Sequence, residues 1–295
     1  MSLNDLRAVR FVNLIFFLAA YTSAQAQLPF DLDRPSARFE LPLDLHEVSA
    51  LTDVDAGTVA CLQDEDAMLY LIDAVTGRIT GKHAFGPPGD MEGLTRVAAE
   101  YYALRSDGLI YRLSLGRSAV QVLDTFRVSL PQGDLEGLAF DERVQRLLIA
   151  PKGMRKGGPD ERDARELYAY DIKTRKLLAE PVMRLSVEDI VAQARASGIM
   201  VPTRTTPKGR EVSAVKLRFS SVAIDPVSDL HYLLSAVDRV LLVVDRLGGF
   251  ITLQQLDATL FPKPEGITFL PDGTLLINSE GKQARPVLAR FERAR

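Results

Sequence analysis

The sequence has no tryptophan, one cysteine and three histidines among its 295 residues. A single cysteine excludes an intramolecular disulfide bond, so packing must stabilise the fold. The cysteine, Cys61, lies in an apolar, strand-like run, which favours a buried structural thiol over a nucleophile. The sequence also contains no GxSxG, HExxH, CxxC or phosphate-loop pattern. The common sequence signatures of catalysis are therefore missing.

An excess of one charge is missing as well. The chain has 36 Lys and Arg residues against 39 Asp and Glu residues, for a formal net charge of -3. This near-balance gives no reason to expect a nucleic-acid partner or a polybasic contact with a membrane. No apolar run approaches the roughly 20 residues that a membrane-spanning helix needs, so we expect no transmembrane domain.

The first 26 residues resemble a signal peptide. Arg7 and Arg10 precede a ten-residue, mostly apolar stretch at 11–20, and Ala24 to Ala26 form a small-x-small cleavage site. We expect cleavage near Ala26 and a secreted or periplasmic protein. An uncleaved N-terminal anchor is the alternative. Residues 27–295 then form a single domain.

A short motif recurs along this domain. It reads GDMEGL at 89–94, GDLEGL at 133–138 and KPEGI at 263–267, and two weaker copies at 48–51 and 219–222 carry serine in place of glutamate. The residues at the shared position, here called the slot residues, are Ser49, Glu92, Glu136, Ser220 and Glu265. They lie 43, 44, 84 and 45 residues apart. Such a period indicates a repeat architecture.

Four short strands separated by turn residues accompany each complete copy, which is typical of a β-propeller blade. The 84-residue gap holds either two blades or one blade with insertions. A glycine-rich loop at 153–164, a helix from Ser186 to Gly198 and a linker at 199–210 favour insertions. We therefore predict an all-β, five-bladed propeller with one helical insertion, and six blades are the alternative. The last unit has only three strands, so segment 38–43 is expected to supply its fourth and close the ring.

The slot order Ser, Glu, Glu, Ser, Glu and the segment 219–291 resemble the SdiA-regulated family. This resemblance implies an exported bacterial propeller with a cation such as calcium near its axis, and a looser kinship to esterase-like and phytase-like propellers. It also implies acidic residues where the second strand of a blade ends. Asp64, Asp107 and Glu280 fit that pattern, whereas Arg105 and Lys152 depart from it.

Equivalent positions of successive blades lie at the same height around the axis, so the slot residues should form a ring at one end of the channel. Three glutamates brought together need either a bound cation or a proton with a raised pKa. Calcium takes roughly 6–8 oxygen ligands and suits the first solution. The expected metal ligands are Glu92, Glu136, Glu265 and Glu280. The alternative is that each glutamate caps backbone N–H groups of the neighbouring blade.

Other residues near this ring are candidates for ligand binding. Lys152 and Arg105 would hold an anionic group, and His46 lies three residues before the first slot. With Ser49 and Ser220, they complete the predicted ligand site. We expect a monomeric binding protein for calcium and an unknown small molecule or protein. A metal-dependent phosphoesterase or esterase-like hydrolase is one alternative, and a purely structural scaffold is another.

Overall fold

The structure is a computed structural model that describes residues 28–116 and 119–294. The expected signal peptide at 1–26 lies outside these residues. Within them, no helix is both long enough and apolar enough to cross a membrane.

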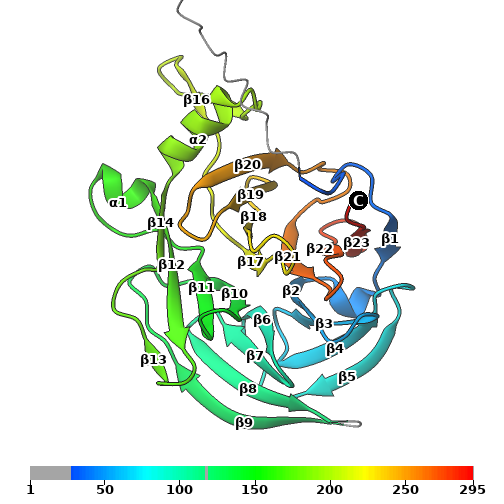
Figure 1. The fold of residues 1–295 in the computed structure, drawn as a ribbon. Helices are drawn as coiled ribbons and strands as arrows, with labels where there is room; N and C mark the ends of the chain where they lie inside the picture. The colour runs from blue at the N-terminus through cyan, green and yellow to red at the C-terminus, as the bar shows by residue number, and fades with distance from the viewer. Residues whose placement is uncertain (1–27, 117–118, 295) are drawn as a thin grey trace, which may run out of the picture.

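Five antiparallel sheets surround a common axis, and each is a blade of the propeller (Figure 1). The first blade contains β2 (Val48–Asp53), β3 (Thr58–Gln63), β4 (Met68–Asp73) and β5 (Ile79–Ala84). The second contains β6 (Met91–Val97), β7 (Glu100–Arg105), β8 (Leu109–Leu115) and β9 (Val120–Arg127). The third contains β10 (Leu135–Asp141), β11 (Arg146–Pro151), β12 (Ala164–Asp171), β13 (Lys176–Leu177) and β14 (Met183–Ser186). The fourth contains β17 (Ser221–Ile224), β18 (His231–Ser235), β19 (Val240–Val244) and β20 (Phe250–Gln255).

The fifth blade joins the two ends of the described chain. It contains β21 (Pro264–Phe269), β22 (Leu275–Ser279), β23 (Val287–Phe291) and the N-terminal strand β1 (Ala37–Glu40). The pairing of β1 with β23 runs from Ala37 opposite Arg290 to Glu40 opposite Val287. The predicted closure and the five-blade count are confirmed. The closing strand is shifted toward the N-terminus, because Leu43–Leu45 form a 3₁₀ turn instead of extending it.

The hydrophobic core is divided among the five spaces between neighbouring blades. One buried cluster, for example, joins Leu104 of the second blade to Ile149 of the third. Another joins Leu276 of the fifth blade to Cys61 of the first. Cys61 is fully buried there, and burial raises the pKa of its thiol, as expected for a structural residue. Each blade is therefore stabilised by both neighbours, and closing the ring stabilises all of them.

The 84-residue gap is one blade with insertions, as predicted. β13 and β14 both pair with β12, and α2 (Val187–Ala196) follows β14 directly. The hydroxyl of Ser186 accepts a hydrogen bond from the Asp189 N–H at 3.0 Å, which confirms the predicted N-cap. The expected loop at 153–164 also holds the single-turn α1 (Pro159–Asp163). The expected linker at 199–210 is wrong in part, since β15 (Thr203–Thr205) and β16 (Glu211–Ser213) form a hairpin there.

Candidate functional site

The slot residues of four blades lie at irregularities in the register of the innermost strand, and Ser220 of the fourth blade directly precedes β17. In the second blade Met91 pairs with Arg105 and Gly93 pairs with Leu104, which leaves Glu92 between them without a partner in the register. Glu136 and Ser49 occupy the same place in the third and first blades. A bulge re-aims the side chain of its extra residue. The repeated sequence motif is therefore the signature of this bulge.

The glycine after Glu92 is required by the neighbouring blade. A Cβ atom on Gly93 would lie 2.7 Å from the Cβ of Leu138 and 2.8 Å from the backbone oxygen of Glu136. Since neither atom can move away easily, only glycine permits this approach of the inner strands. The close approach also brings successive slot residues together at one end of the axis, here called the glutamate mouth.

The two slot serines connect successive blades. The Ser49 hydroxyl donates a hydrogen bond to the backbone oxygen of Met91 at 2.6 Å, and Ser220 donates to that of Pro264 at 3.3 Å. Both serines are almost completely buried. Their hydroxyl groups therefore satisfy backbone oxygens of the next blade.

Two lysines enter the glutamate mouth. The ammonium group of Lys152, which follows β11, forms an ion pair with Oε1 of Glu136. Lys263 lies 2.9 Å from Oε1 of Glu265 and 2.5 Å from Oε1 of Glu280. Sequence analysis had not assigned Lys263 to the site. The available signal was its place two residues before the slot, where Asp90 and Asp134 stand in the two preceding glutamate copies.

Burial and mutual repulsion change the protonation of the glutamates. Burial, followed by the charges of Glu136 and Asp90, raises the pKa of Glu92 to about 9. Burial also raises the pKa of Glu136 to about 8, although the nearby Lys152 opposes this rise. The pKa of Glu265 is raised by burial and lowered in part by Lys263. These groups titrate together, and protons are shared among them at neutral pH.

Lys152 is the electrostatic centre of this ring. Burial alone would lower the pKa of its ammonium group, but the charges of Glu136, Glu265 and Glu92 together raise it. All three slot glutamates thus act on one lysine side chain. The glutamates predicted to converge are brought together, and a lysine of the same protein lies among them.

The rim of the mouth is acidic on the side of the first blade. Asp64 follows β3, and burial together with the charges of Glu47 and Glu280 raises its pKa to about 7. Its Oδ1 atom is buried and has no hydrogen-bond partner within the described chain. His46 belongs to the same rim, since its Nε2 lies 3.0 Å from the backbone oxygen of Lys282.

Arg105 pairs with an aspartate of its own blade. Its Nε and Nη2 atoms donate to the Asp107 carboxylate at 2.9 and 2.7 Å, and Arg127 lies 3.0 Å from the same group. The pKa of Asp107 is held well below its usual range, first by the hydrogen bond from Arg105. Arg105 therefore stabilises its own blade in this arrangement.

The carboxylate groups of the glutamate mouth are the candidate ligands for a metal ion. The part of the chain that the structure describes contains no group of three His, Cys, Asp or Glu side chains positioned as metal ligands. Oε2 of Glu136 and Oδ1 of Asp64 are nevertheless buried acceptors without hydrogen-bond partners in that part. Such orphaned carboxylate oxygens fit a hard cation in chemical type.

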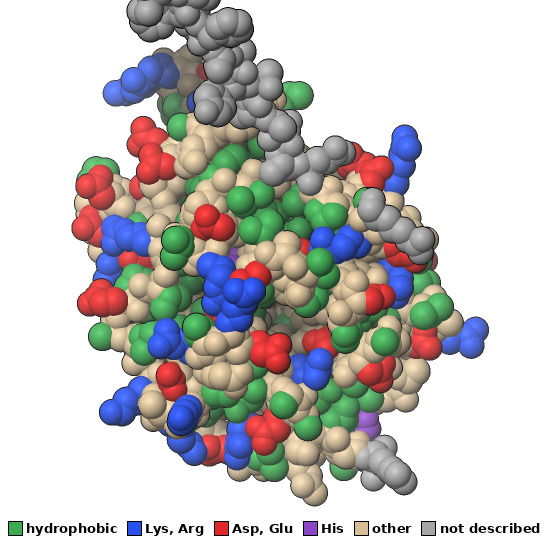
Figure 2. All heavy atoms as spheres, viewed as in Figure 1, with side chains coloured by type: hydrophobic (Ala, Val, Ile, Leu, Met, Phe, Trp, Pro, Cys, Tyr) green, Lys and Arg blue, Asp and Glu red, His purple; other side chains and the backbone are tan. Residues whose placement is uncertain are grey.

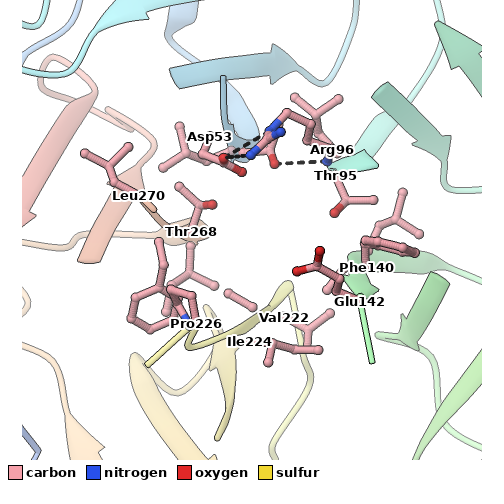
Figure 3. Close-up of a pocket in the computed structure, with 18 of the residues that line it drawn as sticks. Asp53, Thr95, Arg96, Phe140, Glu142, Val222, Ile224, Pro226, Thr268 and Leu270 are labelled. Atoms are coloured by element: carbon pink, nitrogen blue, oxygen red, sulfur yellow. Dashed lines mark hydrogen bonds and ion pairs between the residues drawn. The ribbon is translucent and has the colours of Figure 1, made fainter. Parts of the chain in front are cut away.

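The axis also opens at its other end, which sequence analysis missed. The inner strands end there around a cavity of about 360 Å³ whose lining includes Asp53, Arg96 and Glu142 (Figure 3). None of the slot glutamates lines this cavity. On the face shown in Figure 2, acidic and basic side chains gather around a hollow near the centre. The charged residues that line the cavity differ from blade to blade, so no repeated sequence motif indicated them.

The sequence and the fold were then compared with known proteins. A sequence model described as SdiA-regulated matches residues 40–283. No curated protein matches the sequence. Among solved structures, Myxococcus xanthus glutaminyl cyclase is similar with a TM-score of 0.60 and 13% identity, over 88% of this chain and 95% of that chain. The WD40 β-propeller domain of Doa1 gives a TM-score of 0.50 and 10% identity, over 88% and 97%. At these identities the structural likeness shows the propeller fold alone.

Proposed function

This chain belongs to the SdiA-regulated family, and on that premise we propose that it is a binding protein whose glutamate mouth holds a cation, with calcium as the expected ion. The observation that carries this proposal is the state of Glu136. Its side chain is 2% exposed, and one of its two carboxylate oxygens has no hydrogen-bond partner among the described residues. A buried, half-satisfied carboxylate is costly unless a ligand completes it.

The charges of the mouth support a cation. Glu92, Glu136, Glu265 and Glu280 face the two ammonium groups of Lys152 and Lys263, so negative groups exceed positive ones by two when all are ionised. A divalent ion would offset that excess and remove the need for bound protons. Calcium accepts carboxylate, backbone and water oxygens in a flexible geometry, which suits a ring that is not preformed for a small ion.

Calcium would have to compete with Lys152. The ammonium group of Lys152 already pairs with Glu136, and the slot glutamates are not arranged as a group of three metal ligands in the described chain. We expect Lys152 to leave Glu136 when calcium binds, and Glu92 to turn toward the ion. We also propose that the protein is exported and that its mature form begins at Gln27.

Thermal unfolding of residues 27–295 with EDTA or with calcium tests the proposal. Calcium at about 100 times its dissociation constant should stabilise the protein by about 2.7 kcal/mol and raise its melting temperature. Glu92→Gln and Glu136→Gln should reduce that shift. Glu180→Gln, at an exposed glutamate on the rim of the third blade, is the matched control. Equal melting temperatures of the wild type in EDTA and in calcium would contradict the proposal.

A hydrolase is the second candidate, and one observation favours it. The raised pKa values of Glu92 and Glu136 keep protonated carboxyl groups beside the Lys152 ammonium at neutral pH. A carboxylic acid next to a cation could protonate a leaving group while the cation holds an anionic substrate. Metal-dependent turnover of a phosphoester panel, abolished by Glu136→Gln in a folded protein, would favour this function. Calcium-dependent stabilisation without turnover would favour binding alone.

A further inference from the structure

The cavity at the opposite end of the axis, here called the far mouth, has the size and walls of a small-molecule site. Its volume of about 360 Å³ lies within the range of about 300–1,000 Å³ that is common for such sites. Asp53 lies four positions after Ser49 along β2, so the glutamate mouth and the far mouth are roughly 13 Å apart along one inner strand. A ligand at one end would not contact the slot residues at the other.

Arg96 is the one cation that lines the far mouth among the residues that the structure describes, and it is already bound by the protein. The Nε atom of Arg96 donates to Oδ2 of Asp53 at 3.0 Å, and Nη2 pairs with the same oxygen. Its Nη1 atom donates to the backbone oxygen of Ala98 at 2.8 Å. Three of the five N–H groups of the guanidinium are thus used within the protein, and the Asp53 carboxylate offsets its positive charge. An anionic ligand at Arg96 would therefore also meet the negative charge of Asp53.

The acidic residue on the other side of the cavity has no bonded partner among the described residues. Glu142, directly after β10, is exposed, and its carboxylate forms no ion pair or hydrogen bond within the described residues. Figure 3 shows its side chain directed toward the centre of the cavity. Asp53, Arg96 and Glu142 together carry a net charge of -1 when ionised, and Glu142 carries the part that is not neutralised. The cavity therefore presents one available negative group.

Most of the other residues that line the cavity have apolar side chains, with threonines between them, while polar atoms form more than half of its exposed lining. Phe140 and Ile224 lie on the side of Glu142 in Figure 3, and Pro226 lies across the cavity on the side of Thr268. Thr95 and Thr268 direct their hydroxyl groups toward the same space. A hydroxyl group can accept a hydrogen bond from an ammonium group, and the Phe140 ring can attract a cation through its face.

From this juxtaposition we propose that the far mouth is a second binding site, which takes a small organic cation. The ammonium group of a protonated amine pairs with the Glu142 carboxylate and is hydrogen-bonded by the threonine hydroxyls. The apolar part of the ligand packs against Phe140, Ile224 and Pro226. The Asp53–Arg96 pair lies on the opposite wall. Because Arg96 neutralises Asp53, this wall attracts a cation less than a lone aspartate would, so a ligand with a single positive group is favoured.

Binding of benzylamine tests the proposal, with benzoate and benzyl alcohol as probes of the same shape and different charge. Calorimetric titrations of residues 27–295 in EDTA keep the test independent of any cation at the glutamate mouth. Benzylamine should bind in the millimolar range and at least about tenfold more tightly than either other probe. Glu142→Gln should weaken benzylamine binding about tenfold, whereas Glu180→Gln should leave it unchanged.

Two outcomes would overturn the proposal. One is the absence of benzylamine binding to the wild type under these conditions. The other is binding that depends on the benzene ring alone. In that case benzyl alcohol would bind with the same affinity as benzylamine, and Glu142→Gln would not lower the affinity for benzylamine. Tighter binding of benzoate would instead show that Arg96 is available to anions, and it would also contradict the proposed ligand class.

Discussion

Lys152 donates a hydrogen bond to Oε1 of Glu136, while Oε2 of the same carboxyl group is buried without a partner among the described residues. The protein therefore supplies two cations of its own, Lys152 and Lys263, to the ring of three slot glutamates and leaves one carboxylate oxygen of Glu136 unsatisfied. Charge balance at this mouth depends on which positive species are present: the lysines, protons or a metal ion.

Removing the lysine should strengthen calcium binding. Lys152→Met keeps most of the side-chain volume and removes the ammonium group that competes for Glu136. We expect about a tenfold increase in calcium affinity, measured by titration calorimetry, because a charge-assisted bond no longer has to be broken. Lys156→Met, at an exposed lysine four residues later, is the control and should change nothing. Weaker calcium binding in Lys152→Met would show that the lysine supports the ion site instead.

Without metal, the protein should lose stability as the pH rises. The pKa of Glu92 is about 9 in the folded state against an ordinary value near 4.5, so the native state holds the extra proton between these limits. Stability is greatest below the ordinary value and falls as the pH rises toward 9. In EDTA, we expect a loss of several kcal/mol between about pH 5 and 9, at about 1.4 kcal/mol for each pH unit. Urea unfolding of the wild type and of Glu92→Gln measures it.

The glutamine variant should flatten this pH dependence and be more stable than the wild type near pH 9. Glu180→Gln serves as the matched control, since its side chain lies on the exposed rim of the third blade. Parallel pH profiles for the wild type and Glu92→Gln would mean that Glu92 ionises without cost in the folded protein.

The close approach of the inner strands predicts a strict need for glycine after the slot. Gly93→Ala should destabilise the protein by about 2 kcal/mol or more, because its Cβ meets backbone and Cβ atoms of the next blade at under 3.0 Å. Gly57→Ala is the control, since the nearest atom to its Cβ would be Asp55 Oδ1 at 3.8 Å. We expect that variant to lie within about 0.5 kcal/mol of the wild type. Equal stabilities would mean that the blades can separate easily at this point.

Closure of the ring by β1 should account for a large share of the stability. A chain of residues 41–295 lacks β1 and leaves β23 as an exposed edge, which invites association between molecules. We expect a loss of several kcal/mol in urea unfolding and larger species in size-exclusion chromatography. The chain of residues 37–295 retains the strand and isolates its effect from that of Phe30 and Leu32. Equal behaviour of the two truncated chains would contradict a structural role for β1.

Much of the fold could be predicted because a propeller repeats its local signals. The slot residues mark a register irregularity in four of the five blades, and Ser186 marks the start of the inserted helix through its capping hydroxyl. The β15–β16 hairpin was missed because its short strands are mostly polar and exposed, so they carry no alternation of buried and exposed residues. The ring of glutamates could be predicted because these residues occupy equivalent positions in their blades.

The contacts that decide the chemistry of the ring could not be predicted in the same way. Lys263 precedes its slot in a position where the other glutamate copies have aspartate, and only the geometry shows that it pairs with both Glu265 and Glu280. The far mouth was missed for a related reason. Asp53 of the first blade pairs with Arg96 of the second blade. Because the two residues are of different types, no repeated sequence motif indicates this pair.

Calcium titration of residues 27–295 at two pH values is the most direct test of the central claim, that a buried glutamate ring binds a cation in place of protons. The raised pKa values of Glu92 and Glu136 mean that calcium must displace protons below about pH 8. We predict one ion per chain, with an affinity at least about tenfold higher near pH 9 than near pH 6.5 and with proton release at the lower pH. An affinity that does not change between these pH values, or no calcium binding at either, would contradict it.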